Sequence, residues 1–245
     1  MKHNSRPQPT TSNMTSQQLE QEFLQRIHVA KNQLESLPWE RSEVYWSWLS
    51  QTSHFVDWTT RLITLAAGSC TLAPASSDFH QFLVLHLREE FNHDLIAKQD
   101  LALLKKRDPR LPEIRQAEFE VTFNFHQSLR RRLMMDLPYG EFALLGRMLF
   151  LEGLAAKFGP QLAALVSRHH GEECGRFIAL HGEADQEHLQ EDLAKLKDLE
   201  PAQLDIIRGE LLRTTENYLA ITLEWREFAQ RGLQIDEKAS GKKAG

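Results

Sequence analysis

The chain has few cysteines and no long uninterrupted apolar run. Its 245 residues include two cysteines, Cys70 and Cys174, which lie far apart and form no CxxC pair. This spacing argues against a disulfide framework and against a zinc–thiolate site. We find no run of about 18 apolar residues, the length that a membrane span needs, and the N-terminus is polar rather than signal-like. We therefore expect a cytoplasmic protein without a membrane partner.

The chain also has no excess of basic residues over acidic ones. The chain has 29 Lys and Arg against 34 Asp and Glu, a formal net charge of −5. Neither nucleic acid nor an anionic membrane is therefore expected as a partner. The 41% hydrophobic and 26% charged residues are typical of globular chains, and the length is sufficient for one large helical domain.

Helical periodicity dominates, and no segment alternates apolar and polar residues as a strand does. Thr15 and Gln18 can form a capping box before a helix that Pro38 ends. Further helices are expected at 39–67, at 78–106, at 113–135, from the turn at Gly140 to about 158, at 159–171, at 172–199 and at 201–230. The helix at 39–67 is expected to break near Gln51 and to be ended by Gly68. We predict an all-α bundle of seven or eight helices over residues 16–232, with a disordered leader at 1–15 and a flexible tail at 233–245.

The most informative stretch is FIALHGEADQEHLQEDLAKL, residues 177–196. His181, Asp185 and His188 recur at offsets of four and seven, so they share one face of a helix. Apolar neighbours place that face toward the core. Two buried imidazoles and a carboxylate are unfavourable without compensation, and a bound cation compensates all three.

A second stretch, HLREEFNH, repeats this spacing with His86, Glu90 and His93. In both stretches a carboxylate precedes a histidine by three residues, the pairing that facing helices of di-iron carboxylate bundles use. For either stretch alone, a solvated face or a core hydrogen-bond network explains the pattern about as well as a metal site does. Their repetition favours a metal site.

Glu152, in MLFLEGLAAKF, has apolar neighbours on every side. An ionised carboxylate in such a setting takes up a proton or binds a cation. A neutral, hydrogen-bonded Glu152 is the alternative, but we favour the cation because two ligand-bearing helices are already predicted.

These three motifs together resemble the haem-oxygenase-like di-iron oxidases and oxygenases, over roughly residues 39–199. The resemblance implies a haem-oxygenase-like helical fold with two non-haem iron ions, manganese being the alternative metal. It also implies dioxygen activation to oxidise a small organic acid, amino acid or related metabolite, with an electron donor as a further partner and a homodimer as an allowed assembly. The implied metal-binding and catalytic residues are Glu90, His93, Glu152, His181, Asp185 and His188.

Several alternatives stay open from the sequence. Glu89 could replace Glu90 if the helix register differs, and His86 is either an additional ligand or a support for one. The same site could store or oxidise iron without an organic substrate. Cys174 keeps open a metal-free hydrolase like TenA, and His28 a haem-binding oxygenase.

The aromatic-rich segment 39–67 is predicted to be mainly core. Its part from Trp46 to Trp58 is also our candidate for the substrate wall, with His54, Asp57 and Thr60 as polar lining. The basic run 130–132 could hold a substrate carboxylate, but a solvated charge cluster is the simpler interpretation.

Overall fold

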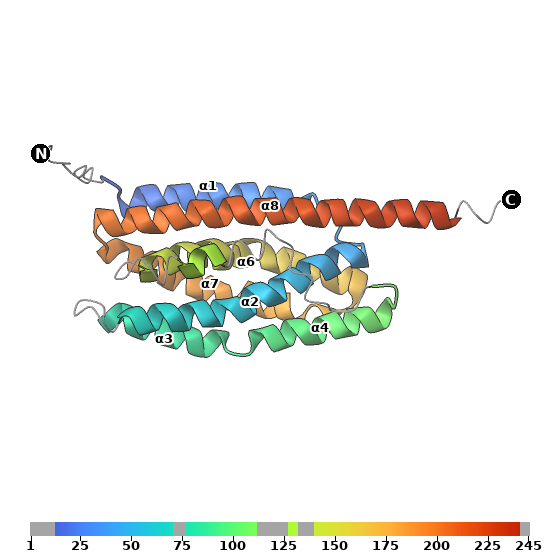
Figure 1. The fold of residues 1–245 in the computed structure, drawn as a ribbon, viewed down its shortest axis with the longest axis horizontal. Helices are drawn as coiled ribbons and strands as arrows, with labels where there is room; N and C mark the ends of the chain where they lie inside the picture. The colour runs from blue at the N-terminus through green and yellow to red at the C-terminus, as the bar shows by residue number, and fades with distance from the viewer. Residues whose placement is uncertain (1–12, 71–76, 112–126, 132–139, 241–245) are drawn as a thin grey trace, which may run out of the picture.

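A computed structural model of the chain describes residues 13–70, 77–111, 127–131 and 140–240 (Figure 1). Within these ranges the chain forms α-helices and short 3-10 helices and no strand, which confirms the all-α prediction. The elements are α1 Ser16–Glu35, α2 Ser42–Cys70, α3 Ser77–Glu90, α4 His93–Arg107, α6 Gly140–His170, η1 Glu172–Cys174, α7 Arg176–Lys195, η2 Leu196–Asp198 and α8 Pro201–Ser240.

The first and last helices form one side of the bundle. Thr15 accepts a hydrogen bond from the Gln18 backbone N–H, and the reciprocal bond completes the predicted capping box. α1 and α8 lie side by side and run in the same direction, with α6 and α7 beneath them and with α3 and α4 at the opposite edge (Figure 1). An ion pair between Arg208 of α8 and Glu22 of α1 links these two helices.

α2 begins and ends three residues later than predicted and is unbroken. The expected break near Gln51 is absent, because Gln51 is buried within a continuous helix. The expected stop at Gly68 is also wrong, since the helix continues to Cys70. A glycine near a helix end is tolerated when it faces solvent, as Gly68 does.

The single helix predicted over 78–106 is two helices. α3 ends at Glu90, and Asn92 adopts a left-handed backbone conformation with φ of 72° before α4 begins at His93. Asparagine tolerates this conformation better than most residues. Glu90 and His93 therefore lie on either side of a break rather than on one helix face.

The helix boundary predicted at Gly159 and Pro160 is absent. Pro160 lies inside α6, which continues to His170. Here α6 packs closely on α7, because a Cβ atom on Gly159 would be 2.8 Å from Gly182 Cα. The two glycines thus mark a close helix contact, one residue from His181.

α6 is the central helix of the bundle. Its segment Phe142–His170 is long and apolar enough to cross a membrane by length and composition, unlike our expectation from the sequence. This is weak evidence for a span, because a core helix has the same composition and α6 packs against α1, α2, α7 and α8.

Some predicted elements lie outside the described residues. Of the helix expected at 113–135, residues 127–131 are described and are helical. Residues 1–12 of the leader and 241–245 of the tail are outside, while α8 extends past the expected end near Gln230 to Ser240.

Candidate metal centre

Four helices bring together the side chains that the sequence singled out. The end of α3 and the start of α4 face the middle of α6 and α7. The eight residues that meet here are His86, Glu89 and Glu90 of α3, His93 of α4, Glu152 of α6, and His181, Asp185 and His188 of α7. The ligand role of each one stays a prediction, but the three separated motifs do converge.

The first group consists of Glu90, His93 and His181. Glu90 Oε2 lies 3.5 Å from His93 Nδ1 and 3.9 Å from His181 Nε2. One potential ligand atom from each residue lies within 4.8 Å of the other two. The turn at Asn92 makes this possible, since it places His93 back beside Glu90 after α3 has ended.

His181 is oriented like a metal-binding histidine. Its Nδ1 lies 3.0 Å from the backbone carbonyl oxygen of Phe177, one turn earlier in α7. A carbonyl oxygen only accepts, so Nδ1 carries a proton and donates it, and in the neutral ring Nε2, which faces Glu90, is the nitrogen free to bind a metal. Such a bond to the distal nitrogen commonly fixes the tautomer of histidine ligands.

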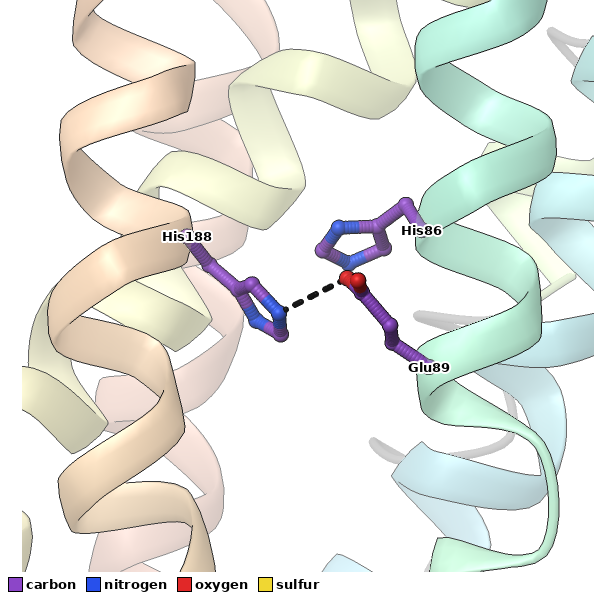
Figure 2. Close-up of side chains that lie close together, drawn as sticks. All are labelled: His86, Glu89 and His188. Atoms are coloured by element: carbon purple, nitrogen blue, oxygen red, sulfur yellow. Dashed lines mark hydrogen bonds and ion pairs between the residues drawn. The ribbon is translucent and has the colours of Figure 1, made fainter.

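The second group surrounds His188. Its Nε2 lies 3.1 Å from Glu89 Oε2 and its Nδ1 lies 3.2 Å from Asp185 Oδ1. Figure 2 shows His188 of α7 pointing across the gap toward His86 and Glu89 of α3, and the two imidazole rings are 4.7 Å apart. Glu90, Asp185 and His188 also offer ligand atoms within 4.8 Å of one another, so the two groups adjoin.

Both members of the Glu89 and Glu90 pair face the centre. Glu90 is buried among His93 and His181, whereas the Glu89 side chain is 54% exposed and reaches His188 from the rim. The sequence analysis treated Glu89 and Glu90 as alternatives that depend on the helix register. Because α3 ends at Glu90, that choice does not apply.

Glu152 reaches the centre through His86. Glu152 Oε1 lies 3.0 Å from His86 Nε2, although the two are not aligned as a hydrogen bond. Glu152 Oε2 is buried and has no hydrogen-bond partner among the described residues. His86 therefore belongs to the cluster and contacts both Glu152 and His188.

Mutual interactions shift several pKa values. Burial alone would raise the pKa of Glu90, but the neighbouring imidazoles of His181 and His93 outweigh it and hold that pKa well below its usual range. Burial raises the pKa of Asp185 to about 6. The hydrogen bond to Asp185 raises the pKa of His188 to about 9 in spite of burial. Without a metal, protons on the histidines balance the carboxylates.

The donor set fits a divalent metal. Buried atoms that could coordinate an ion have no hydrogen-bond partner among the described residues; they are His86 Nε2, His93 Nδ1, His181 Nε2 and Glu152 Oε2. Orphaned polar atoms each cost about 1–3 kcal/mol. Imidazole and carboxylate groups are donor types that bind divalent metals in proteins.

An apolar cavity of about 110 Å³ opens onto this cluster. Glu90, Glu152, His181 and Asp185 form its polar end. Most of the remaining lining is apolar or aromatic, including Trp48, Phe55, Met148, Leu151, Phe158 and Phe177. The arrangement places a small, mainly apolar space directly against the candidate ligands.

α2 lines this cavity with a different face from the predicted one. The lining residues are Trp48, Thr52, Phe55, Val56 and Thr59, which recur at helical spacing. Trp46 and Trp58, the ends of the predicted wall, and the predicted polar residues His54, Asp57 and Thr60 do not line it. Asp57 instead forms an ion pair with Arg61, 3.0 Å away.

Two alternative sites receive no support. Cys174 is buried away from the cavity lining, and burial raises the pKa of its thiol, so a thiolate nucleophile is disfavoured. His28 is exposed on α1, with Nε2 3.0 Å from Asn32 Nδ2. Neither residue is placed to act on a ligand in the cavity.

Sequence reasoning missed two residues. Asp192 is fully buried one turn after His188, and its spacing of four from His188 and seven from Asp185 could have identified it. Arg147 of α6 is also fully buried and lines the cavity, with its guanidinium 5.5 Å from the centre of the Phe55 ring. The apolar residues on both sides of Arg147, the same signal that identified Glu152, could have found it.

Comparisons with known proteins identify the fold. No family model matches the chain, and no curated protein matches its sequence. One similar solved structure is a domain of unknown function with a heme oxygenase-like fold from Shewanella denitrificans OS217, at 16% identity and a TM-score of 0.72, covering 89% of this chain and 95% of that one.

Another similar structure is a TenA homolog from Pseudomonas syringae pv. tomato str. DC3000, at 10% identity and a TM-score of 0.65, covering 91% of this chain and all of that one. Identities this low show a shared fold and carry no activity across. The chain therefore has an all-α, haem-oxygenase-like fold.

Proposed function

We propose that this protein is a non-haem di-iron oxidase or oxygenase that uses dioxygen to oxidise a small organic acid, an amino acid or a related metabolite. The observation that carries the proposal is a buried cluster of histidines and carboxylates, from four helices, that opens onto an apolar cavity. A structural ion would need no cavity beside it, whereas oxidation of an organic molecule requires one.

The residues proposed to hold the two ions are Glu90, His93, Glu152, His181, Asp185 and His188. When bound, ferrous iron supplies the electrons that reduce dioxygen. The chain contributes positioning: the Phe177 carbonyl fixes the His181 tautomer, and the hydrogen bond to Asp185 orients His188. The apolar lining excludes water, which protects reactive species from side reactions.

The cavity limits the substrate to a compact molecule with an apolar body. For scale, an enclosed apolar cavity of roughly 150 Å³ holds one benzene molecule. This cavity is partly open, and its volume of about 110 Å³ suits the binding of a body of a few carbon atoms. Glu90, Glu152 and Asp185 lie at one end of the cavity, where they would hold the metal against this body.

Arg147 supports an acidic substrate. Burial lowers the pKa of Arg147 to about 9, even though the charge of Glu210 opposes the shift. The guanidinium thus stays charged near neutral pH, and Glu210 is shared with Arg213, whose Nε lies 3.0 Å from Glu210 Oε2. A substrate carboxylate in the cavity would add a second counter-charge to a desolvated arginine.

Metal analysis tests the site first. Protein produced with iron should contain near two irons per chain, and His188→Ala should lose stoichiometric iron. The matched control is His169→Ala, since His169 is an exposed histidine away from the cluster. Retention of both irons in His188→Ala would reject that ligand assignment.

Rapid mixing of the ferrous protein with dioxygen tests the reaction. Short aliphatic carboxylates should accelerate the decay of the oxygen-dependent absorbance if they are oxidised in the cavity. If no acid changes the rate of this decay and ferric iron is the sole product, the result would instead favour an iron-storing or iron-oxidising protein.

A further inference from the structure

The N-terminus of α7 has no cap from its own sequence. Gly175 occupies the N-cap position and makes no side-chain hydrogen bond to the first turn. The first backbone N–H groups of a helix have no partner within the helix, and a cap residue normally accepts from one of them. Because Phe177 in this turn is buried, its N–H needs a partner from elsewhere in the fold.

Asp100 of α4 supplies this cap. Its Oδ2 accepts a hydrogen bond of 2.8 Å from the backbone N–H of Phe177, and its Oδ1 accepts one of 3.0 Å from Arg176 Nε. Asp100 is 0% exposed, and a buried carboxylate is unfavourable unless it is paired. The helix dipole also favours a negative charge at this end of α7. The cap thus joins two helices through residues that are 77 positions apart.

The joined helices each carry a candidate ligand close to the cap. Asp100 follows His93 by seven residues, so both lie on one face of α4. His181 follows Phe177 by four residues on α7. The rings of His93 and His181 are 4.8 Å apart. The same two helices therefore meet twice, at the cap and at the group of Glu90, His93 and His181.

Phe177 connects the cap to His181 directly. Its N–H donates to Asp100, and its carbonyl oxygen accepts from His181 Nδ1 at 3.0 Å. The Phe177 ring lies 4.2 Å from the His181 ring and lines the cavity. A displacement of Phe177 would therefore move the His181 imidazole and one wall of the cavity together.

We infer that Asp100 is a positioning residue for the metal ion proposed to bind at Glu90, His93 and His181. It acts by fixing the first turn of α7 against α4, and it does not itself line the cavity. His188 lies about three turns beyond Phe177 on α7, so the group around it should depend less on the cap. This inference rests on the proposed function, since it concerns one ion of the same centre.

Cobalt titration of the metal-free protein under anaerobic conditions tests this role. Asp100→Ala removes the cap, whereas Asp100→Asn keeps a side-chain oxygen that can accept from the Phe177 N–H. The control is Thr15→Ala, because Thr15 caps α1 and α1 carries no proposed ligand. Loss of such a cap typically costs about 1 kcal/mol. The control therefore separates lost stability from lost positioning.

We expect wild type and Thr15→Ala to bind two cobalt ions per chain with the same affinities by equilibrium dialysis. Asp100→Ala should bind one ion about 10–100-fold more weakly, the effect typical of a residue that orients a ligand, and the other ion unchanged. The visible bands of one cobalt ion should change with it. Asp100→Asn should recover most of the lost affinity.

Asp100→Glu provides a second test if Asp100→Ala does not fold, which circular dichroism reports. It keeps the charge but moves the acceptor by one methylene group, so it should weaken the same ion and leave the other unchanged.

Three results would overturn the inference. Asp100→Ala, or Asp100→Glu in its place, could bind both ions as Thr15→Ala does, or could lose affinity equally for both. Asp100→Asn could also be as weak as Asp100→Ala, which would exclude the Phe177 bond as the cause. All three leave the proposed di-iron function intact, whereas a wild type that binds fewer than two cobalt ions would reject that function itself.

Discussion

His188 lies between two carboxylates, and both favour its protonated form. Asp185 accepts from one nitrogen and Glu89 lies beside the other, so the imidazolium is stabilised. Its pKa of about 9 lies above the unfolded value of about 6.5. In the metal-free protein this contributes stability that is complete below about pH 6.5 and is lost as the pH rises through about 9.

Metal binding should therefore release a proton from His188. At about pH 7.5 the metal-free residue is mostly charged, and a metal ligand must be neutral. We expect proton uptake by the buffer, measured by calorimetry in buffers of different ionisation enthalpy, and a release that vanishes above about pH 9. His188→Ala should release about one proton fewer per chain. Equal release from both proteins would contradict the proposed role.

Arg147 gives a second prediction at the residue scale. Arg147→Met should weaken the binding of a short carboxylate by roughly 10–100-fold, since a charge-assisted hydrogen bond contributes about 1.5–3 kcal/mol. The corresponding amide should bind about equally to both proteins, and metal content should not change. Calorimetry on the metal-loaded protein measures both affinities.

Arg213→Met is the control for that change. Arg213 contacts the same Glu210 but does not line the cavity, so its loss should leave the affinity for the carboxylate unchanged. If the two variants behave alike, Arg147 acts through Glu210 and does not recognise the substrate.

At the scale of elements, the contact between α6 and α7 sets the position of the ligands on α7. Gly159 and Gly182 let the two backbones approach one residue away from His181. A Cβ atom on Gly182 would lie 3.0 Å from Pro160 N, a backbone atom that cannot move aside. Pro160 lies inside α6 at this contact, where it removes one helical hydrogen bond.

Gly182→Ala should therefore destabilise the protein. Overpacking typically costs about 1–3 kcal/mol, which lowers the melting temperature by roughly 2–10 °C for a chain of this size. Gly68→Ala is the matched control, because Gly68 is helical and no atom lies within 4 Å of its added Cβ. That change should raise the melting temperature slightly. Equal effects would show that the α6–α7 contact is not close.

At the scale of the whole molecule, the proposed metal centre links some helices of the bundle and not others. The proposed ligands come from α3, α4, α6 and α7, and the pair α1 and α8 contributes none (Figure 1). Binding to the native state stabilises it by about 2.7 kcal/mol at a free metal concentration of about 100 times Kd. Local opening of the ligand-bearing segments should respond most.

Hydrogen–deuterium exchange can map this effect. Saturating manganese should slow exchange at residues 86–95 and 181–188, while exchange over 16–35 of α1 should change little. His188→Ala should show a smaller change in the same segments. Uniform slowing over all helices would indicate global stabilisation by a site elsewhere.

Much of the architecture follows from local patterns. The capping box at Thr15 and the apolar stripe of α1 require information from a single helix, so they are readable in the sequence. The ligand face of α7 is predictable for the same reason, because four- and seven-residue spacings return to one direction on any α-helix. The resemblance of the three motifs then indicated the haem-oxygenase-like fold.

Other features depend on packing between distant segments. A glycine next to a proline usually ends a helix, yet Gly159 and Pro160 continue α6 because α7 packs against them. The left-handed turn at Asn92 was hidden by a helical pattern that extends across it. The position of Arg147 beside the cavity also depends on this packing.

The sequence by itself determined the helical class, the candidate ligand residues and their spacing along α7, because these depend on the geometry of one helix. Only the tertiary structure decided that Glu89 and Glu90 both face the centre, that Glu152 meets His86, and that Asp192 is buried. The contact between Glu152 and His86 joins residues far apart in the chain, so it depends on how α3 and α6 pack and not on local periodicity.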